Sequence, residues 1–569
     1  MRTFIIFLLL LPVWGWGQST ILKDVNIIDV ESKKIRKEMS VIITHDKISG
    51  IDKFSRIKVS SNDTVIDAKG KYLMPGLIDA HIHFFQSGGL YTRPDALDFR
   101  TEFPYSKEIE FAKNNASDYL KRYLRLGITT VMDVGGPFWN FVIRDSVARN
   151  MTAPNVLVTG PLFSMVDRPK LDEGDPPIIK VSDKKDIDAL FEKMLPYQPD
   201  FIKVWYIVTK ETPPRKTFPL VKYIGDLCRK NNLLLAVHAT QLETAKLAVE
   251  AGANILVHSI EDQIIPKSFI STLQKQKVTY IPTLTVSNGY TRTFTGYLNH
   301  KRQDLDWANP FAYSSLMDLE KIDSLTWPAY LRRIYKKKQP VVYNAVDSIM
   351  KVNLENLNKK GINIATGTDA GNIGTFHASS YLQELEAMEE ANLSNWDIIV
   401  SSTINPAKGF GISDKTGSVK TGKQADLLLL NKNPLEDIRN LNAIELVFTS
   451  GILLYPDSIL VETPEQIVQR QVNAYNARNV EAFLSTYATD IELYNAQGEL
   501  MMKGHDQLRT AYADLLRRTP DLYCEIENRM VINNKVIDKE KVRINEEYVY
   551  SVAVYEVSNG KIVKVNFLK

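Results

Sequence analysis

The chain has 569 residues, 44% hydrophobic and 24% charged, so it is long enough for several domains and too apolar for intrinsic disorder. Its 70 Lys and Arg residues against 67 Asp and Glu residues give a formal charge of +3, which excludes the strongly basic surface expected of a nucleic-acid partner. The two cysteines, Cys228 and Cys524, lie far apart, which excludes a disulfide framework and a thiolate zinc site, so any metal ion must have other ligands.

The first 18 residues are typical of a secretory signal peptide. Arg2 supplies a positive charge, residues 4–14 form an apolar run, and small residues follow at Gly15 and Gly17. The run is too short to cross the roughly 30 Å hydrocarbon core as a helix, and no later stretch reaches the roughly 18 apolar residues of a membrane span. We expect an exported protein, periplasmic or secreted, with no stable membrane span; an uncleaved N-terminal anchor is the alternative.

Changes of pattern divide the rest of the chain. Residues 19–74 read as short strands separated by turns, and residues 414–462 return to this character, which predicts that the two segments complete one small β-sandwich. Between them, residues 75–413 alternate short apolar runs with helical stretches, which predicts an α/β fold, a TIM (β/α)8 barrel. Residues 463–569 begin with amphipathic helices and continue as strands, which predicts a separate α+β domain.

Two histidines end the first strand predicted in the barrel. His81 and His83 are two residues apart, so an extended strand directs both imidazoles to one side, where they can hold a metal ion. The surrounding residues 75–83, Pro-Gly-Leu-Ile-Asp-Ala-His-Ile-His, resemble the signature of the amidohydrolase superfamily at its first barrel strand. The resemblance extends by pattern over roughly residues 21–461 and implies that later strands end in further metal ligands.

Later predicted strands of the barrel end in residues that can serve as these further metal ligands. Lys203 lies inside the apolar run Phe-Ile-Lys-Val-Trp, where an ammonium group is costly unless it is paired or uncharged. The alternative is a lysine that extends its amine to solvent from a strand end. His238 and His258 each close a strand, one βα unit apart, and each alone is also compatible with an ordinary core histidine. Asp369 ends a strand at a glycine turn, where a simple turn aspartate is the alternative.

The resemblance implies a binuclear metal centre. Its ligands would be His81, His83 and Asp369 for one divalent ion and His238 and His258 for the other; zinc is the expected metal, and manganese, iron and cobalt stay open. Lys203 would carry carbon dioxide as a carbamate, an anion that bridges the two ions. A hydroxide between the ions would attack the substrate carbonyl, and Asp369 would take its proton and return it to the leaving nitrogen as the catalytic residue.

Three residues near these ligands are candidates for substrate contact. Arg93 follows the first metal motif and can hold a carboxylate bidentately, with a surface ion pair as the alternative. Tyr206 follows the apolar run around the lysine. His377 resembles a histidine of the lysine-bridged branch that includes Xaa-Pro dipeptidases and imidazolonepropionases, which implies substrate contact or support of a metal ligand from behind, with a surface histidine as the alternative. Aromatic and basic residues in 291–343 predict a lid over the barrel mouth, or else a packed surface insertion.

The last domain resembles the SnoaL-like, nuclear transport factor 2-like group. The residues that carry this resemblance are 472–483 and 487–490, and they are specific for the fold alone. No catalytic residue follows from them. We expect a role in association, which would make the protein a homo-oligomer.

These patterns favour an exported metal-dependent hydrolase of amide-type carbon–nitrogen bonds in a small-molecule substrate outside the peptides. A Xaa-Pro-type dipeptidase is an alternative within the same class. A catalytically silent barrel that serves ligand binding or assembly is an alternative from another class, although the full set of ligand-type residues argues against it. The substrate stays open because the loops that shape a pocket vary within a family.

Overall fold

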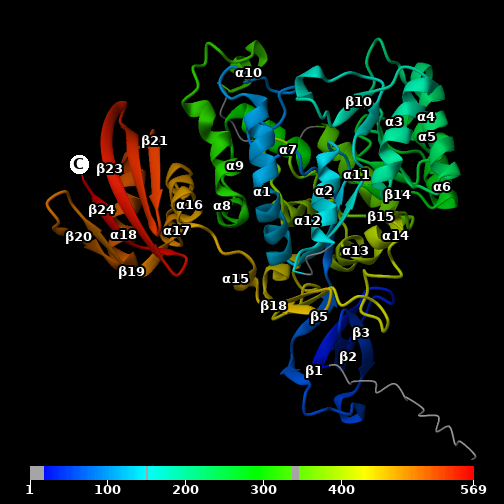
Figure 1. Cartoon of the computed structure of the whole chain (residues 1–569), viewed down its shortest axis with the longest axis horizontal. Helices are drawn as coiled ribbons and strands as arrows, with labels where there is room; N and C mark the ends of the chain where they lie inside the picture. The colour runs from blue at the N-terminus through cyan, green and yellow to red at the C-terminus, as the bar shows by residue number, and fades with distance from the viewer. Residues whose placement is uncertain (1–17, 149–151, 336–344, 569) are drawn as a thin grey trace, which may run out of the picture.

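A computed structural model describes residues 18–148, 152–335 and 345–568, which form three connected parts (Figure 1). A β-sheet domain lies at the bottom of this view, the predicted barrel region lies above it, and a C-terminal α+β domain lies to one side. Apart from Gln18, the predicted signal peptide lies outside the described residues. Across the described part of the chain, no helix is long and apolar enough to cross a membrane.

The β-sheet domain is built from both segments that flank the predicted barrel. Its strands are β1 (Ser19–Asp29), β2 (Lys34–Thr44), β3 (Lys47–Asp52), β4 (Thr64–Asp67), β5 (Tyr72–Pro75), β16 (Leu427–Leu430), β17 (Ile444–Thr449) and β18 (Ile452–Leu454). They hydrogen-bond into one eight-stranded sheet of order β18-β17-β16-β5-β1-β2-β3, in which β4 pairs with β1. The antiparallel pair of β5 and β16 joins the two segments, and all four leucines of β16 are buried.

Two parallel sheets form the predicted barrel region, with orders β6-β7-β8 and β10-β9-β11-β12-β13-β14-β15. The strands are β6 (Leu77–Ile82), β7 (Ile128–Asp133), β8 (Asn155–Val158), β9 (Leu162–Ser164), β10 (Ile178–Lys180), β11 (Ile202–Trp205), β12 (Leu235–His238), β13 (Ile255–Val257), β14 (Thr279–Ile281) and β15 (Asn363–Ile364). Their residues are mostly apolar because parallel strands are covered on both faces.

Backbone hydrogen bonds join β6 to the residues that follow β15. The Ala80 N–H donates to the Thr366 carbonyl over 2.9 Å, and the Asp369 N–H donates to the His81 carbonyl over 2.7 Å. The last parallel strand therefore lies beside the first. This mixed α/β arrangement is compatible with a TIM-like barrel, whose strand carboxyl ends are the usual place of an active site.

Helices cover the outside of these strands (Figure 1). They are α1 (Tyr105–Arg125), α2 (Trp139–Val147), α3 (Lys184–Met194), α4 (Pro214–Lys230), α5 (Leu242–Ala251), α6 (Lys267–Gln276), α11 (Ala345–Lys359), α12 (Tyr381–Glu390), α13 (Asn395–Ser401) and α14 (Ile404–Gly409). A short helix, α15 (Pro456–Ile459), follows the β-sheet domain and leads to the last domain.

The insertion before α11 packs against the C-terminal domain. It contains α7 (Val286–Thr295), α8 (Arg302–Trp307), α9 (Pro310–Ser315) and α10 (Ala329–Tyr335). Buried side chains such as Tyr313 and Trp327 share one hydrophobic cluster with Ile467 and Phe483 of the last domain. The described residues of 291–335 after α7 therefore form a packed insertion that carries the C-terminal domain, the alternative to a lid, and residues 336–343 of the predicted lid lie outside the described residues.

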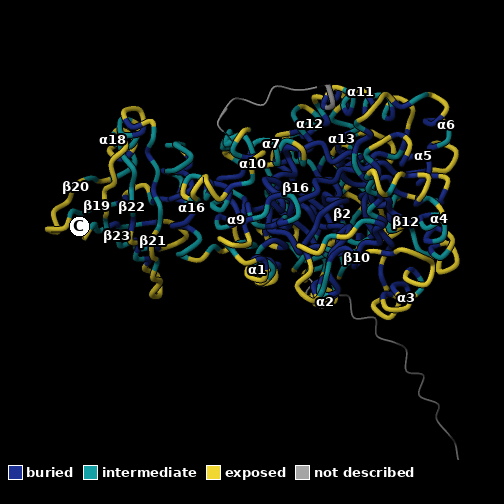
Figure 2. The backbone as a smooth tube through the Cα atoms, turned by 90° about the horizontal axis from the view of Figure 1, so that it is seen from above, coloured by how far each residue is buried: buried dark blue, intermediate teal, exposed yellow. Residues whose placement is uncertain are grey.

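The C-terminal domain is a six-stranded sheet packed against helices. Its elements are α16 (Pro464–Asn476), α17 (Val480–Leu484), β19 (Tyr487–Tyr494), β20 (Leu500–Lys503), α18 (Gly504–Arg518), β21 (Tyr523–Ile532), β22 (Lys535–Ile544), β23 (Glu547–Ser558) and β24 (Lys561–Phe567). A capping box between Thr463 and Gln466 fixes the start of α16, with Pro464 in the first turn. In Figure 2, burial is densest in the barrel region, and this domain shows more intermediate and exposed chain.

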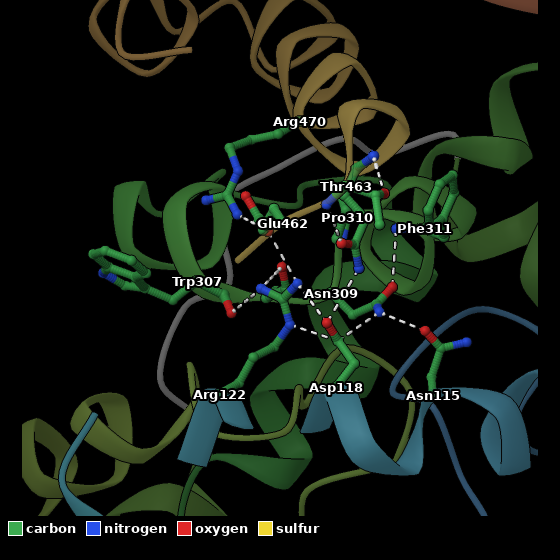
Figure 3. A network of polar contacts seen from close by, with 12 residues as sticks. Asn115, Asp118, Arg122, Trp307, Asn309, Pro310, Phe311, Glu462, Thr463 and Arg470 are labelled. Carbon is green, nitrogen blue, oxygen red and sulfur yellow. Dashed lines mark hydrogen bonds and ion pairs between the residues drawn. The ribbon is translucent and has the colours of Figure 1, made fainter. Parts of the chain in front are cut away.

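A buried arginine, Arg122, connects the barrel region to the start of the C-terminal domain (Figure 3). Arg122 on α1 donates to the Asp118 carboxylate over 2.7 and 3.1 Å and to Glu462 Oε1 over 3.0 Å. Its Nη1 also donates to the carbonyl oxygens of Trp307 and Ala308, each over 3.0 Å. Because Glu462 immediately precedes the C-terminal domain, this network fixes the junction with that domain.

Candidate active site

One cavity of about 310 Å³ lies at the carboxyl ends of the parallel strands. All six residues predicted as metal ligands line it: His81, His83, Lys203, His238, His258 and Asp369. His81, Lys203 and His238 lie on β6, β11 and β12, whereas His83, His258 and Asp369 follow β6, β13 and β15, so the fold brings together residues as far apart in the sequence as His81 and Asp369.

The two histidines of the first strand lie side by side. His81 Nε2 and His83 Nε2 are 3.2 Å apart, because alternate residues of an extended chain face the same side. His83 Nδ1 lies 2.7 Å from the Gly135 carbonyl oxygen, which fixes the ring with Nε2 directed toward the cavity. In contrast, His81 Nδ1 is buried without a hydrogen-bond partner among the described residues.

Three neighbouring strands supply the opposite wall. Lys203 on β11 is 1% exposed, and His238 ends the adjacent strand β12. His258 follows β13, and its ring centroid lies 4.4 Å from that of His238. His258 Nδ1 is 2.8 Å from Thr283 Oγ1, whereas His238 Nδ1 is buried with no partner in the described chain.

Asp369 lies between the two groups of histidines. Its Oδ1 is 3.4 Å from His81 Nε2 and 3.1 Å from His83 Nε2, and its Oδ2 is 3.9 Å from His258 Nδ1. Ligand-type atoms of His81, His258 and Asp369 all lie within 4.8 Å of one another, close enough to hold one metal ion. Nearby, a Cβ on Gly371, whose φ is +105°, would lie 2.6 Å from the His83 carbonyl oxygen, so this turn requires glycine.

The backbone is strained at three positions in the cavity wall. His258, Thr283 and Asp369 have φ values of 75°, 46° and 59°, in the left-handed region that residues other than glycine rarely adopt. Such strain costs free energy and concentrates at functional sites. Two of these residues are histidine and aspartate with ligand-type atoms in the cavity.

Burial sets the charge of the site. It lowers the pKa of His81, His238 and His258 well below 6.5, and the nearby Lys203 ammonium adds to the effect, so the imidazoles are neutral, as metal ligation requires. Burial also lowers the pKa of Lys203 from 10.5 to about 7, against the attraction of the Asp369 carboxylate.

Two buried carboxyl groups that the sequence analysis did not single out hold the site's loops. Asp79 Oδ1 accepts from the Thr368 N–H over 3.0 Å and Oδ2 accepts from Thr368 Oγ1 over 2.7 Å, which ties β6 to the loop of Asp369. Glu384 accepts from the N–H groups of Leu284 and Thr285 over 2.8 and 2.9 Å. Burial raises the pKa of both carboxyl groups to about 7. The sequence signal for Asp79 was its position within the first metal motif, residues 75–83.

The three predicted substrate contacts have different places. Arg93 lines the cavity, with its guanidinium already paired with Asp95 over 2.8 Å. Tyr206 is 2% exposed, donates to the Pro214 carbonyl and lies outside the cavity lining. His377 is also outside it, because its ring nitrogens face Tyr123 Oη at 3.0 Å and the Gln86 carbonyl at 2.8 Å. Arg93 is therefore the one of the three that lines the cavity, and contact of Tyr206 and His377 with the substrate stays a prediction.

The rest of the cavity wall is mixed. Phe85, Leu162, Trp205 and Met350 supply apolar surface. Glu261, three residues after His258, adds a carboxyl group whose pKa is raised by burial. The cavity therefore combines a cluster of ligand-type groups with an apolar wall, as small-molecule sites commonly do.

Comparison with known families assigns the chain. The model of the amidohydrolase family matches residues 72–284 and 336–454, more than half of the chain, and that of a SnoaL-like domain matches residues 468–565. The protein belongs to the amidohydrolase family and carries a C-terminal SnoaL-like domain, which confirms both resemblances. It is therefore a hydrolase that acts on carbon–nitrogen bonds, in a family that typically binds divalent metal ions. Residues 285–335, left unmatched, include most of the packed insertion.

Individual relatives are distant. Guanine deaminase of Escherichia coli K12 is 22% identical over 432 residues, covering 72% of this chain and 84% of that enzyme. A 5-methylthioadenosine/S-adenosylhomocysteine deaminase of Caldanaerobacter subterraneus is 23% identical over 438 residues, covering 73% and 85%. The crystal structure of a Xaa-Pro dipeptidase with bound methionine superposes with a TM-score of 0.58 at 21% identity, covering 77% of this chain and 100% of that one. This last likeness shows the fold.

Proposed function

We propose that this protein is an exported metal-dependent hydrolase that cleaves amide-type carbon–nitrogen bonds in a small molecule. The observation that carries the proposal is the wall of the strand-end cavity, where four histidines, one aspartate and Lys203 converge. Lys203 makes no hydrogen bond to a described residue, and the attraction of the Asp369 carboxylate does not offset the cost of burying its ammonium form.

The residues present fit a pair of divalent ions, zinc being the metal we expect. The donors are neutral imidazoles and a carboxylate, which suit zinc and related ions, and the partnerless Nδ1 of His238 is a buried polar atom that a metal centre would explain. The lowered pKa of Lys203 provides neutral amine, which reacts with carbon dioxide to give a carbamate and a proton. We propose the carbamate as the anionic group between the two ions.

The protein's own groups would then move the protons. Bound divalent ions supply Lewis acidity and make water nucleophilic near neutral pH. Asp369, whose Oδ1 lies 3.1 Å from His83 Nε2, would accept a proton from the attacking water and return it to the leaving nitrogen. The apolar side chains of Phe85, Leu162 and Trp205 limit the access of bulk water and so strengthen electrostatic interactions within the closed (β/α)8 barrel that we propose.

A Xaa-Pro-type dipeptidase is the second candidate. Its support is a pair of opposite charges in the cavity wall, the Arg93 guanidinium and the Glu261 carboxyl group, which match the two ends of a zwitterionic dipeptide. Beyond its bonds to Asp95 and Asn372, Arg93 keeps two N–H groups for a substrate carboxylate. The shared fold with a Xaa-Pro dipeptidase is consistent with this candidate.

Export and association complete the proposal. The apolar run in residues 4–14 supports removal of a signal peptide. The mass of the mature protein after expression in a bacterial host tests this, because it shows whether the first residues have been removed. The SnoaL-like domain supports a homo-oligomer, which light scattering at several protein concentrations tests.

Metal content and a substrate panel test the enzymatic proposal. We expect about two ions per chain in protein purified without chelator, and release of amine from one class in a panel of amides, lactams and dipeptides. His258→Ala should lose metal and activity, whereas His45→Ala, at an exposed histidine, should keep both. Parent protein that stays metal-free after loading with zinc and bicarbonate would contradict the proposal. Preference for Xaa-Pro dipeptides over other amides would select the second candidate.

A further inference from the structure

Asn372 connects the proposed catalytic carboxylate to residues outside the ligand cluster. Its Nδ2 donates to Asp369 Oδ1 over 2.7 Å and to the Asp369 carbonyl over 3.1 Å. Its Oδ1 accepts from Arg93 Nη1 and from the Tyr290 hydroxyl, each over 2.8 Å. Asn372 is 3% exposed, so each of these hydrogen bonds is largely shielded from water.

The arginine decides which way the amide points. A guanidinium group only donates hydrogen bonds, so the atom of Asn372 that faces Arg93 must be the carbonyl oxygen. The amide nitrogen then faces Asp369, where a carboxylate oxygen needs a donor. Reversal of the amide would place donors against Arg93 and two oxygens against each other at Asp369. The Asn372 amide therefore has one stable orientation.

Arg93 is itself held in place. Its Nε and Nη2 donate to the two carboxylate oxygens of Asp95, each over 2.8 Å, and Arg168 Nε lies 3.5 Å from Asp95 Oδ2. A bidentate pair of this kind fixes both position and plane of the guanidinium. Arg93 precedes α1, Tyr290 lies on α7, and Asn372 follows β15, so three segments distant in the sequence meet at one amide.

We propose that Asn372 is a positioning residue that fixes the Asp369 carboxylate in its ligand orientation, with Arg93 and Tyr290 as its anchors. This inference rests on the proposed metal-dependent function. Oδ1 of Asp369 is held toward His81 and His83, and the strained backbone of Asp369, at φ 59°, needs such support. A carboxylate already oriented in the free protein binds metal more tightly because less ordering accompanies binding.

Zinc titration of the full-length protein, stripped by chelator, tests this role. Asn372→Ala should lower the affinity for Zn²⁺ about 10- to 100-fold, as loss of a partner behind a metal ligand typically does. Tyr290→Phe removes one anchoring hydroxyl and should lower it about 3-fold, in keeping with the modest worth of one hydrogen bond. Tyr91→Phe is the matched control, because the Tyr91 hydroxyl donates to Asp318 over 2.7 Å, away from this network.

The absorption spectrum of the Co²⁺-loaded protein gives a second readout that a merely structural role would not move. We expect Tyr290→Phe to change the intensity or position of the ligand-field bands, and Tyr91→Phe to leave them as in the parent. Parent-like zinc affinity in Asn372→Ala, or equal losses in the two tyrosine variants, would overturn the proposal while leaving the metal-dependent function intact. If Asn372→Ala fails to fold, the tyrosine pair decides. A parent that binds no zinc would overturn both.

Discussion

Arg122 at the domain junction and Lys203 in the cavity are both 1% exposed, yet only the arginine has hydrogen-bond acceptors for its charged group among the described residues. Arg122 donates to two carboxylates and two carbonyl oxygens. No described residue accepts a hydrogen bond from Lys203. Removing a partner from a buried pair is strongly destabilising, whereas an unpaired buried charge is already costly and persists where function requires it. Pairing thus separates a structural cation from a functional one in this chain.

The largest expected effect comes from Lys203→Met. We expect at least about a thousandfold loss of activity, about 4 kcal/mol of barrier, together with loss of bound metal. Stripped of metal, the variant should unfold at a higher urea concentration than the stripped parent, because an unpaired buried ammonium has been removed. Elemental analysis and urea titration measure the two effects.

Lys423→Met is the control for that experiment. Lys423 is also buried but is paired, with Nζ 3.4 Å from Glu31 Oε1 and a hydrogen bond to Ser418 Oγ. Its loss should lower stability and leave metal content unchanged. If Lys203→Met lost stability as Lys423→Met does and kept its metal, the distinction between the two buried lysines would fail.

A second large effect is expected at the domain junction. Arg122→Met should lower the free energy of unfolding by about 3 kcal/mol, because Asp118 loses its cation and the Trp307 and Ala308 carbonyls lose a buried donor, although Glu462 keeps its ion pair with Arg470. Zinc content should stay that of the parent. Arg125→Met on the same helix should cost only about 1 kcal/mol, since its partner Asp457 is 94% exposed. Equal costs in urea titrations of the two variants would contradict this assignment.

A smaller, pH-dependent effect is expected where a carboxyl group is buried among neutral donors. Burial raises the pKa of Asp426 from 3.8 to about 6, although it accepts from the Ser450 N–H and the Thr416 hydroxyl. A raised folded-state pKa means that the folded protein binds the proton more tightly. The stabilisation is therefore complete below pH 3.8 and is lost as the pH rises through 6, by about 3 kcal/mol in all.

Asp426→Asn removes this titration. The stability of the variant relative to the parent should rise by up to about 3 kcal/mol between pH 4 and pH 7. Urea titrations at both pH values measure the difference, and a constant offset between variant and parent would show that Asp426 does not titrate in this range.

Much of the candidate site was predictable because strand ends carry local signals. His81 and His83 follow from the period of two in a strand, and His238 and His258 each end an apolar run that the structure forms as a strand. Tyr206 and His377 lie outside the cavity lining, because a residue close in sequence to a site residue can point away from the cavity. Tyr206 donates to the Pro214 carbonyl eight positions along the chain, and His377 faces the Tyr123 hydroxyl 254 positions away; only the folded structure shows these contacts.

The sequence alone determined the family, the order of the domains' elements and the residue types that converge on the cavity, because period and motif are local properties of the chain. Only the tertiary structure decided that the insertion carries the C-terminal domain, that three residues of the cavity wall are strained, and that Asn372 links Arg93 to Asp369. Such contacts join residues 279 positions apart, and their free energies depend on burial and geometry that exist only once the chain has folded.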